Sequence, residues 1–237
     1  MKRLALLSAA AILLTATLPA LADIESIKGA APSVGMSTGL ILMKGHLRSA
    51  SELAKAGNIE QAKLHFAHPA GEIYPDIAAE LDARKVGFTA ELKALEGSSA
   101  ETWSAALDAV IAAIGKAEAT LAADEAGSPG FVADVTSRVL SEAAGEYAAA
   151  FPAGQPVNAE EYQDSRGFVI AVGDIITATK ASLAAKDAAA AGVLESSVAE
   201  LAKAWPSIEP PAAPVVAIAD VEALVGKYKE SAAALMK

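Results

Sequence analysis

Helix-forming sequence runs through most of the chain and is interrupted at short stretches that are rich in glycine and proline. Apolar residues recur at intervals of three and four, while the alternating patterns and β-branched runs that are typical of strands are scarce. Alanine is abundant and aromatic residues make up 5% of the chain, which favours close packing of helices over a sheet sandwich. The sequence therefore predicts an all-α fold, an up-and-down helical bundle.

The N-terminus has the features of a secretory signal peptide. Lys2 and Arg3 precede an apolar run that ends in small residues, so cleavage of residues 1–22 is expected after Ala22. The apolar run is short for a membrane anchor, and we expect no transmembrane segment in the mature chain. The chain contains no cysteine, which excludes disulfides, thiolate metal sites and thiol nucleophiles. These features predict an exported, periplasmic protein.

The mature chain is strongly acidic. Loss of Lys2 and Arg3 from the 19 basic residues, against 29 acidic ones, leaves a net charge of about −12. This excess of negative charge argues against nucleic acid as a partner, because nucleic-acid binding depends on Lys and Arg. Sequence motifs of serine hydrolases, zinc proteases, P-loop proteins and dinucleotide-binding enzymes are missing. We therefore expect a binding protein and not an enzyme.

Capping residues and helix breakers predict the helix boundaries in the single domain expected over 23–237. The first helix should span about 33–56 and end at Gly57, which readily adopts the left-handed conformation. The second should span about 59–68 and break at Pro69. Further helices are expected over about 76–85, 98–123, 128–151, 158–186 and 219–236, with a bend near 188–192 and a proline-rich connector over 206–216.

All three histidines, His46, His65 and His68, fall within one window of 23 residues. A helical hairpin centred near Gly57 places His46 and His68 at the same level on facing helices, roughly ten or eleven residues from the turn. His65 and His68 are three residues apart and share a helix face. Three neutral imidazoles supply most of a ligand shell for Zn, Cu, Ni or Fe. The sequence therefore predicts a transition-metal site in this hairpin.

Neighbouring residues could complete the ligand shell. Glu72 and Met43 lie about one turn farther from the hairpin loop than the histidines. Glu72, Asp76 or Tyr74 would make a harder site, whereas Met43 or Met36 would favour copper. Haem ligation by histidine and methionine on the same face is a variant of this hypothesis. We expect an ion of Fe, Cu or Zn, with His46, His65, His68, Glu72 and Met43 as its ligands.

Several of these residues also have a structural explanation. His68 precedes Pro69 and could end its helix with a hydrogen bond, and His46 could be an exposed residue beside Arg48. Methionines at helical spacing usually fill apolar cores. The alternative function is therefore a non-metal interaction or scaffolding bundle, whose last amphipathic helix could dock on a partner.

A second group of polar residues lies in the segment 158–174. Glu161 and Asp164 lie near the start of a predicted helix, and Arg166 follows among apolar neighbours. The acids could point toward the bundle interior and add oxygen ligands to the metal site. They could equally stabilise the helix dipole, with Arg166 paired to one of them. The sequence leaves both interpretations open.

The segments GHLRSASELAKAGNIEQAKLHFAHPAGEIYPDI, EYQDSRGFVIAV and LAKAWPSIEPP follow the expected signal peptide in this order. In these segments the chain resembles exported helical bundles of the imelysin and periplasmic iron-uptake kind. The G-x-H-x-x-E signature of those proteins is absent, because Gly45 directly precedes His46. The resemblance implies a carrier or accessory in metal uptake or homeostasis, with His46, His65, His68 and Glu72 as candidate ligands. The expected partners are a metal ion and a membrane transporter or another periplasmic protein.

Overall fold

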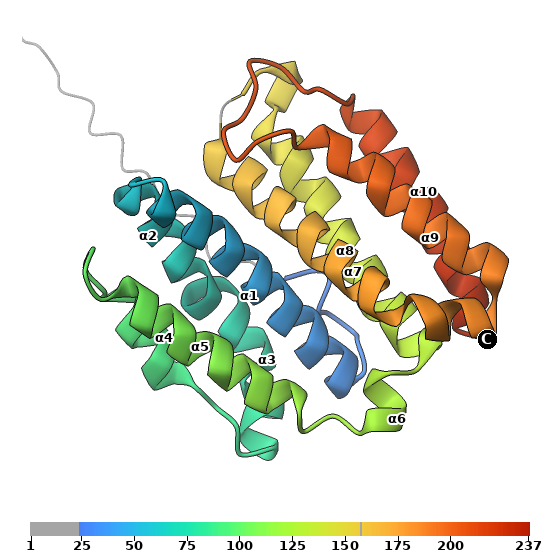
Figure 1. The fold of residues 1–237 in the computed structure, drawn as a ribbon, viewed down its shortest axis with the longest axis horizontal. Coiled ribbons are helices and arrows are strands. Elements are labelled where there is room, and N and C mark those ends of the chain that lie inside the picture. Colours follow the sequence, from blue (N-terminus) through green and yellow to red (C-terminus); the bar gives the residue numbers. More distant parts are fainter. Residues whose placement is uncertain (1–23, 157) are drawn as a thin grey trace, which may run out of the picture.

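The chain folds into helices and loops, and no strand occurs among residues 24–156 and 158–237, which the computed structural model describes (Figure 1). The all-α prediction is confirmed, while the expected signal peptide lies outside the described residues. The α-helices are α1 (Pro32–Lys55), α2 (Ile59–His68), α3 (Tyr74–Ala83), α4 (Thr89–Glu96), α5 (Trp103–Glu118), α6 (Ala123–Ala126), α7 (Pro129–Ala150), α8 (Ala159–Lys186), α9 (Ala188–Leu201) and α10 (Ile218–Leu235).

The helices form two groups that meet along α1 (Figure 1). Helices α7 to α10 run up and down as a four-helix bundle, in which each helix packs against the next and α10 returns to α7. Helices α2 to α5 form a smaller group on the other side of α1. Since α1 packs against both groups, its residues are buried from Val34 to Leu47 with the single exception of Lys44.

Two glycines allow α1 and α8 to cross in backbone contact. A Cβ atom at Gly167 would lie 2.3 Å from the carbonyl oxygen of Gly45, and a Cβ atom at Gly45 would lie 2.4 Å from Cδ1 of Phe168. Four residues along α1, Ser49 Oγ donates a hydrogen bond of 2.6 Å to the backbone oxygen of Gln163. This crossing fixes the position of α8 along the axis of α1.

The hairpin between α1 and α2 is formed as predicted. Gly57 has a positive φ of 86°, which is accessible to glycine at little cost. The N–H groups of Gly57 and Asn58 donate to the oxygens of Ala54 and Leu53, at 3.0 and 2.9 Å. These two bonds form a Schellman motif, which ends α1 and reverses the chain within three residues.

The predicted break at Pro69 is wrong, because the helix continues through it. Residues Pro69–Ile73 form a π-helical turn that joins α2 to α3. Proline lacks an N–H group and its ring clashes with the carbonyl one turn earlier in an α-helix. A π-turn is wider, and its bond runs from the N–H of Tyr74 to the oxygen of Pro69. The turn therefore accommodates the proline without ending the helix.

Other boundaries differ by a few residues from those predicted. The helix expected from 98 begins at Trp103, because Ser99 Oγ accepts from the N–H of Glu101 within a preceding turn. Helix α4 was not predicted. The bend expected near 188–192 lies at Asp187, which separates α8 from α9 and caps the latter.

Replacement of Asp187 by alanine is expected to destabilise the fold by about 1 kcal/mol, as is usual for the loss of an N-cap. Its Oδ1 accepts from the N–H groups of Ala189 and Ala190, at 3.0 and 2.9 Å. Asp187→Asn keeps an acceptor oxygen and should remain close to wild type. Urea unfolding of the three proteins tests this, and equal midpoints for Asp187→Ala and wild type would contradict it.

Among the described helices, α8 is long and apolar enough to cross a membrane, judged by length and composition. Helices in the core of a folded protein meet the same criterion, and α8 packs against α1, α7 and α9. The absence of a transmembrane segment from the mature chain stays a prediction.

The last helix is part of the bundle. Helix α10 packs its apolar face against α7 and α9 and buries Val221, Val225 and Leu235. Tyr228 OH donates to Thr136 Oγ1 of α7 at 2.7 Å. The apolar face of α10 is therefore occupied within the chain, which leaves it unsuited to docking on a partner.

Candidate metal centre

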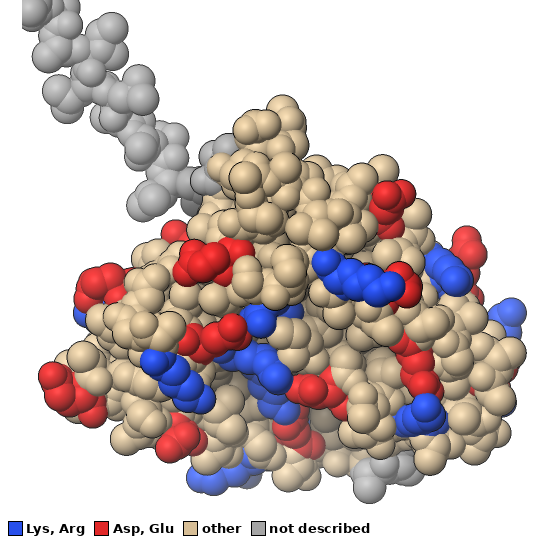
Figure 2. All heavy atoms as spheres, turned by 45° about the horizontal axis from the view of Figure 1, so that its top comes forward, with Lys and Arg blue, Asp and Glu red and all other residues tan. Residues whose placement is uncertain are grey.

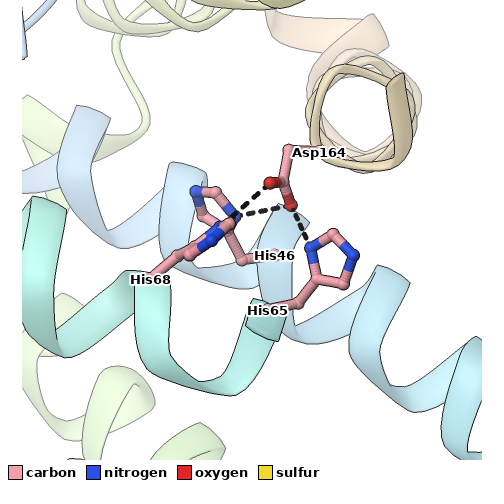
Figure 3. A group of neighbouring side chains, drawn as sticks. All are labelled: His46, His65, His68 and Asp164. Carbon is pink, nitrogen blue, oxygen red and sulfur yellow. Dashed lines mark hydrogen bonds and ion pairs between the residues drawn. The ribbon is translucent and has the colours of Figure 1, made fainter. Parts of the chain in front are cut away.

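The three histidines converge on one carboxylate at the junction of the two helix groups (Figure 3). His46 comes from α1, His65 and His68 from α2, and Asp164 from α8. One potential ligand atom from each side chain lies within 4.8 Å of the others. Among the residues whose side chains the structure describes, no other group of three or more His, Asp and Glu side chains meets this criterion.

Asp164 accepts hydrogen bonds from all three rings in the metal-free protein. Its Oδ1 accepts from Nδ1 of His46 at 2.6 Å and from Nδ1 of His65 at 2.7 Å. Its Oδ2 accepts from Nδ1 of His68 at 3.0 Å. Each ring thus turns the same nitrogen toward a single point, as Figure 3 shows. An ion at that point would meet three nitrogens and one oxygen.

The spacing of the rings suits a small ion. Nδ1 of His46 and Nδ1 of His68 lie 3.3 Å apart, and the two rings meet edge to face. Two nitrogen ligands at about 2.0–2.1 Å from a tetrahedral ion stand about 3.3–3.4 Å apart. The distances from the Nδ1 atoms to the Asp164 oxygens are shorter than this ligand spacing, because direct hydrogen bonds join these atoms in the metal-free protein. An ion would therefore require the carboxylate to withdraw by a fraction of an ångström.

Most of the centre is closed to solvent. His46, His65 and Asp164 expose at most 2% of their surface, whereas the side chain of His68 remains 18% exposed. Glu160 lies beside that opening, with Oε2 at 3.6 Å from Nε2 of His68. An ion from solvent would therefore enter past His68.

The negative charge of Asp164 and the positive charge of His68 stabilise each other. Burial opposes ionisation of Asp164, but the charge of His46 and the hydrogen bonds from the three rings hold its pKa well below the usual value. For His68, burial favours the neutral ring, yet the hydrogen bond and charge of Asp164, with the charges of Glu72 and Glu160, raise its pKa to about 9. A protonated imidazole therefore neutralises Asp164 while no metal is bound.

Further carboxyl groups surround the centre. Burial, followed by the charges of Asp164, Glu161 and others, raises the pKa of Glu146 well above its usual value. Oε2 of Glu146 is buried and has no hydrogen-bond partner among the described residues. Burial and then the charges of Asp164 and Glu72 likewise raise the pKa of Glu161. The region contains more carboxyl groups than it can readily ionise, so a cation here would relieve their repulsion.

The other predicted ligands lie outside the four-residue group. Glu72 is exposed on the π-helical turn, where its charge acts on His68. Met43 lies on α1 and is completely buried in the apolar core of the protein. Asp76 accepts from the N–H of Ile24 and Tyr74 OH accepts from the N–H of Phe88, so both have partners elsewhere. Glu72 and Met43 as ligands stay predictions.

The second polar group separates into different roles. Asp164 points toward the histidines, as expected if an acid of this segment adds an oxygen ligand to the metal site. Arg166 pairs with Glu52 of α1 at 2.7 Å, and not with an acid of its own helix. Asp174 pairs with Arg48 at 2.7 Å on the surface. The alternative that His46 is exposed beside Arg48 is wrong, since His46 is buried.

A surface groove lies apart from the histidines. It has a volume of about 840 Å³ and is lined by α1, α5, α7 and α8, with Ile41, Leu107 and Ile111 among its apolar residues. Lys44–Glu118 and Arg48–Asp174 ion pairs lie at the same groove. Over the face drawn in Figure 2, acidic and basic side chains are interspersed. The acidic excess of the chain forms no single large patch on this face.

Residues 122–237 match the family described as an iron permease-associated 4-helix bundle domain. The matched segment contains α7 to α10 and therefore Asp164, while the three histidines precede it. The match supports the expected likeness to helical bundles associated with iron uptake, and it does not extend to imelysin in particular. Searches of curated proteins and of solved structures gave no match.

Without metal, the protein is expected to lose stability as the pH rises from about 6.5 to about 9. The pKa of His68 is 6.5 unperturbed and about 9 in the fold. Its stabilising contribution is therefore complete below the lower value and is lost as pH passes the upper one, by on the order of 3 kcal/mol. Urea unfolding of metal-free protein at about pH 6 and about pH 10 measures this. His68→Gln should flatten the dependence, and an equally steep loss in that variant would contradict the assignment.

Proposed function

We propose that this chain is an exported helical protein that binds one transition-metal ion between His46, His65, His68 and Asp164. It serves metal uptake or homeostasis as a carrier or accessory to a membrane transporter, and it is a binder with no catalytic role. The observation that carries the proposal is the convergence of four potential ligand atoms within 4.8 Å in a largely buried position. The family match of the adjoining bundle favours iron as the cargo.

The donor set is consistent with this role. Three imidazoles and one carboxylate suit Fe(II), Zn(II) and Cu(II), and four protein ligands can saturate a tetrahedral ion. A carrier needs a closed ligand shell that can reopen, and the partly exposed His68 provides the movable side. Copper and zinc would bind such a set more tightly than iron, so metal supply in the compartment decides occupancy.

Metal titration of the purified mature protein tests the proposal. After removal of metal, the wild type should take up close to one equivalent of Zn(II), of Cu(II), or of Fe(II) under anaerobic conditions. His65→Ala/His68→Ala should lose this uptake, because two of the three nitrogens are removed. Far-UV circular dichroism reports whether the variant remains folded.

Glu60→Ala/Lys63→Ala is the matched control. It also places two alanines three residues apart on α2, but at surface positions that pair with each other. This variant should bind metal like wild type. Unchanged uptake by the histidine variant would remove the site from consideration.

A scaffolding role is the second candidate, and the apolar groove favours it. The groove at α1, α5, α7 and α8 is large enough for a drug-sized ligand or a docked helix, and Ile111 within it is 43% exposed. Metal analysis of protein isolated from its native compartment separates the two candidates. Stoichiometric metal supports the carrier, whereas a metal-free protein that fails to take up metal in vitro favours the scaffold.

A further inference from the structure

The second ring nitrogen of His65, Nε2, has a hydrogen-bond partner outside the four-residue group. While Nδ1 faces Asp164, Nε2 of His65 lies 2.7 Å from Oε1 of Gln163. Gln163 immediately precedes Asp164 on α8, and its side chain is completely buried. Its backbone oxygen is held by Ser49 Oγ of α1 at 2.6 Å. The amide is therefore fixed by the same helix crossing that places the carboxylate.

The amide oxygen determines which ring nitrogen carries the proton. An amide oxygen accepts hydrogen bonds and cannot donate them, so its contact with Nε2 requires an N–H at that nitrogen. A neutral ring that is protonated at Nε2 leaves its lone pair on Nδ1, which points at the centre. An ion at the centre would take the place of the hydrogen on Nδ1 and would leave the Nε2–H bond to Gln163 intact.

We infer that Gln163 is a positioning residue for metal binding, which holds His65 in the Nε2–H tautomer and keeps Nδ1 available to the ion. This inference rests on the proposed function. Metal-bound histidines usually donate their second N–H to a carboxylate or carbonyl oxygen, which fixes ring orientation and increases ligand basicity. Among the ring nitrogens of the centre, Nε2 of His65 is the buried one that meets an uncharged side-chain oxygen.

A purely structural role explains the amide less well. Nε2 of Gln163 is buried and has no hydrogen-bond partner among the residues that surround it in the described chain. A buried donor without a partner costs free energy. Only the oxygen of the Gln163 amide is hydrogen-bonded, so the side chain contributes little to the stability of the fold. The same oxygen is well placed to orient His65.

Two substitutions separate these roles. Gln163→Leu removes the acceptor at similar size, and Gln163→Glu keeps an acceptor oxygen at this position in either protonation state. We expect Zn(II) affinity, measured by competition with a chelating dye, to fall about 10- to 100-fold in Gln163→Leu. Gln163→Glu should bind more tightly than Gln163→Leu, because it retains the acceptor oxygen. Thermal melts of the metal-free proteins measure any structural effect separately.

A spectroscopic measurement reads the tautomer directly. In two-bond ¹H–¹⁵N correlation spectra of the Zn(II)-loaded wild type, Nε2 of His65 should be protonated and Nδ1 should be the metal-bound nitrogen. Metal on Nε2, or Gln163→Leu with wild-type affinity, overturns the role of Gln163 and leaves the metal site intact. Failure of the wild type to bind Zn(II) overturns both this inference and the proposed function.

Discussion

Gly167→Ala is expected to destabilise the protein by about 3 kcal/mol or more, at the upper end of the range for overpacked positions. The new methyl group would lie 2.3 Å from the carbonyl oxygen of Gly45 and 3.0 Å from Ser49 Oγ, so α1 and α8 would have to separate. Backbone atoms of a buried helix cannot move aside as a flexible side chain can. Because Asp164 lies one turn before Gly167, separation of the helices would also withdraw the carboxylate from the histidines.

Gly173→Ala is the matched control on the same helix. A Cβ atom there would meet Val198 at 3.5 Å, which is an ordinary contact. Alanine is also the better helix former by about 1 kcal/mol, so this variant should be as stable as wild type or more stable. Urea unfolding and Zn(II) titration of both variants test the account. Equal stability of Gly167→Ala and Gly173→Ala would contradict the backbone contact between α1 and α8.

Asp164→Asn is expected to lower Zn(II) affinity by roughly 100-fold or more, beyond the usual effect of an outer-shell substitution. The amide keeps the size of the side chain but removes the one negative charge that faces all three rings. It also removes the main group that raises the pKa of His68, so the metal-free variant should lose much of its pH-dependent stability.

Asp174→Asn makes the same chemical change on the same helix at an exposed ion pair with Arg48. Surface pairs of this kind contribute little, and this variant should match wild type in affinity and stability. Competition titrations with Zn(II) provide the comparison. An affinity of Asp164→Asn within a few-fold of Asp174→Asn would mean that Asp164 is not a ligand.

The hairpin could be predicted because its determinants are local. Gly57 ends α1, Asn58 begins the return, and equal counts from this turn bring His46 and His68 level with each other. Helices α7 and α8 could likewise be placed from the caps at Ser128 and Asn158. Pro69 misled the prediction, because its effect depends on whether the helix can widen into a π-turn, which the sequence does not reveal.

The sequence indicated that an acid of segment 158–174 could be the fourth ligand, but it did not show which acid. Asp164 contacts His46 across 118 positions, and the contact depends on the crossing of α1 and α8 at two glycines. Residue periodicity places Asp164 on a face of α8 but does not say which helix that face meets. Gln163 was overlooked for the same reason, since its partner His65 becomes a neighbour only through that crossing.

X-ray absorption spectroscopy of the metal-loaded protein tests the central claim most directly. For the Zn(II) form, the account predicts a first shell of three imidazole nitrogens and one carboxylate oxygen at about 2.0–2.2 Å. His65→Ala/His68→Ala should show neither this shell nor bound metal. A shell made of oxygen alone, or one without the multiple-scattering signal of imidazole, would contradict binding between α1, α2 and α8.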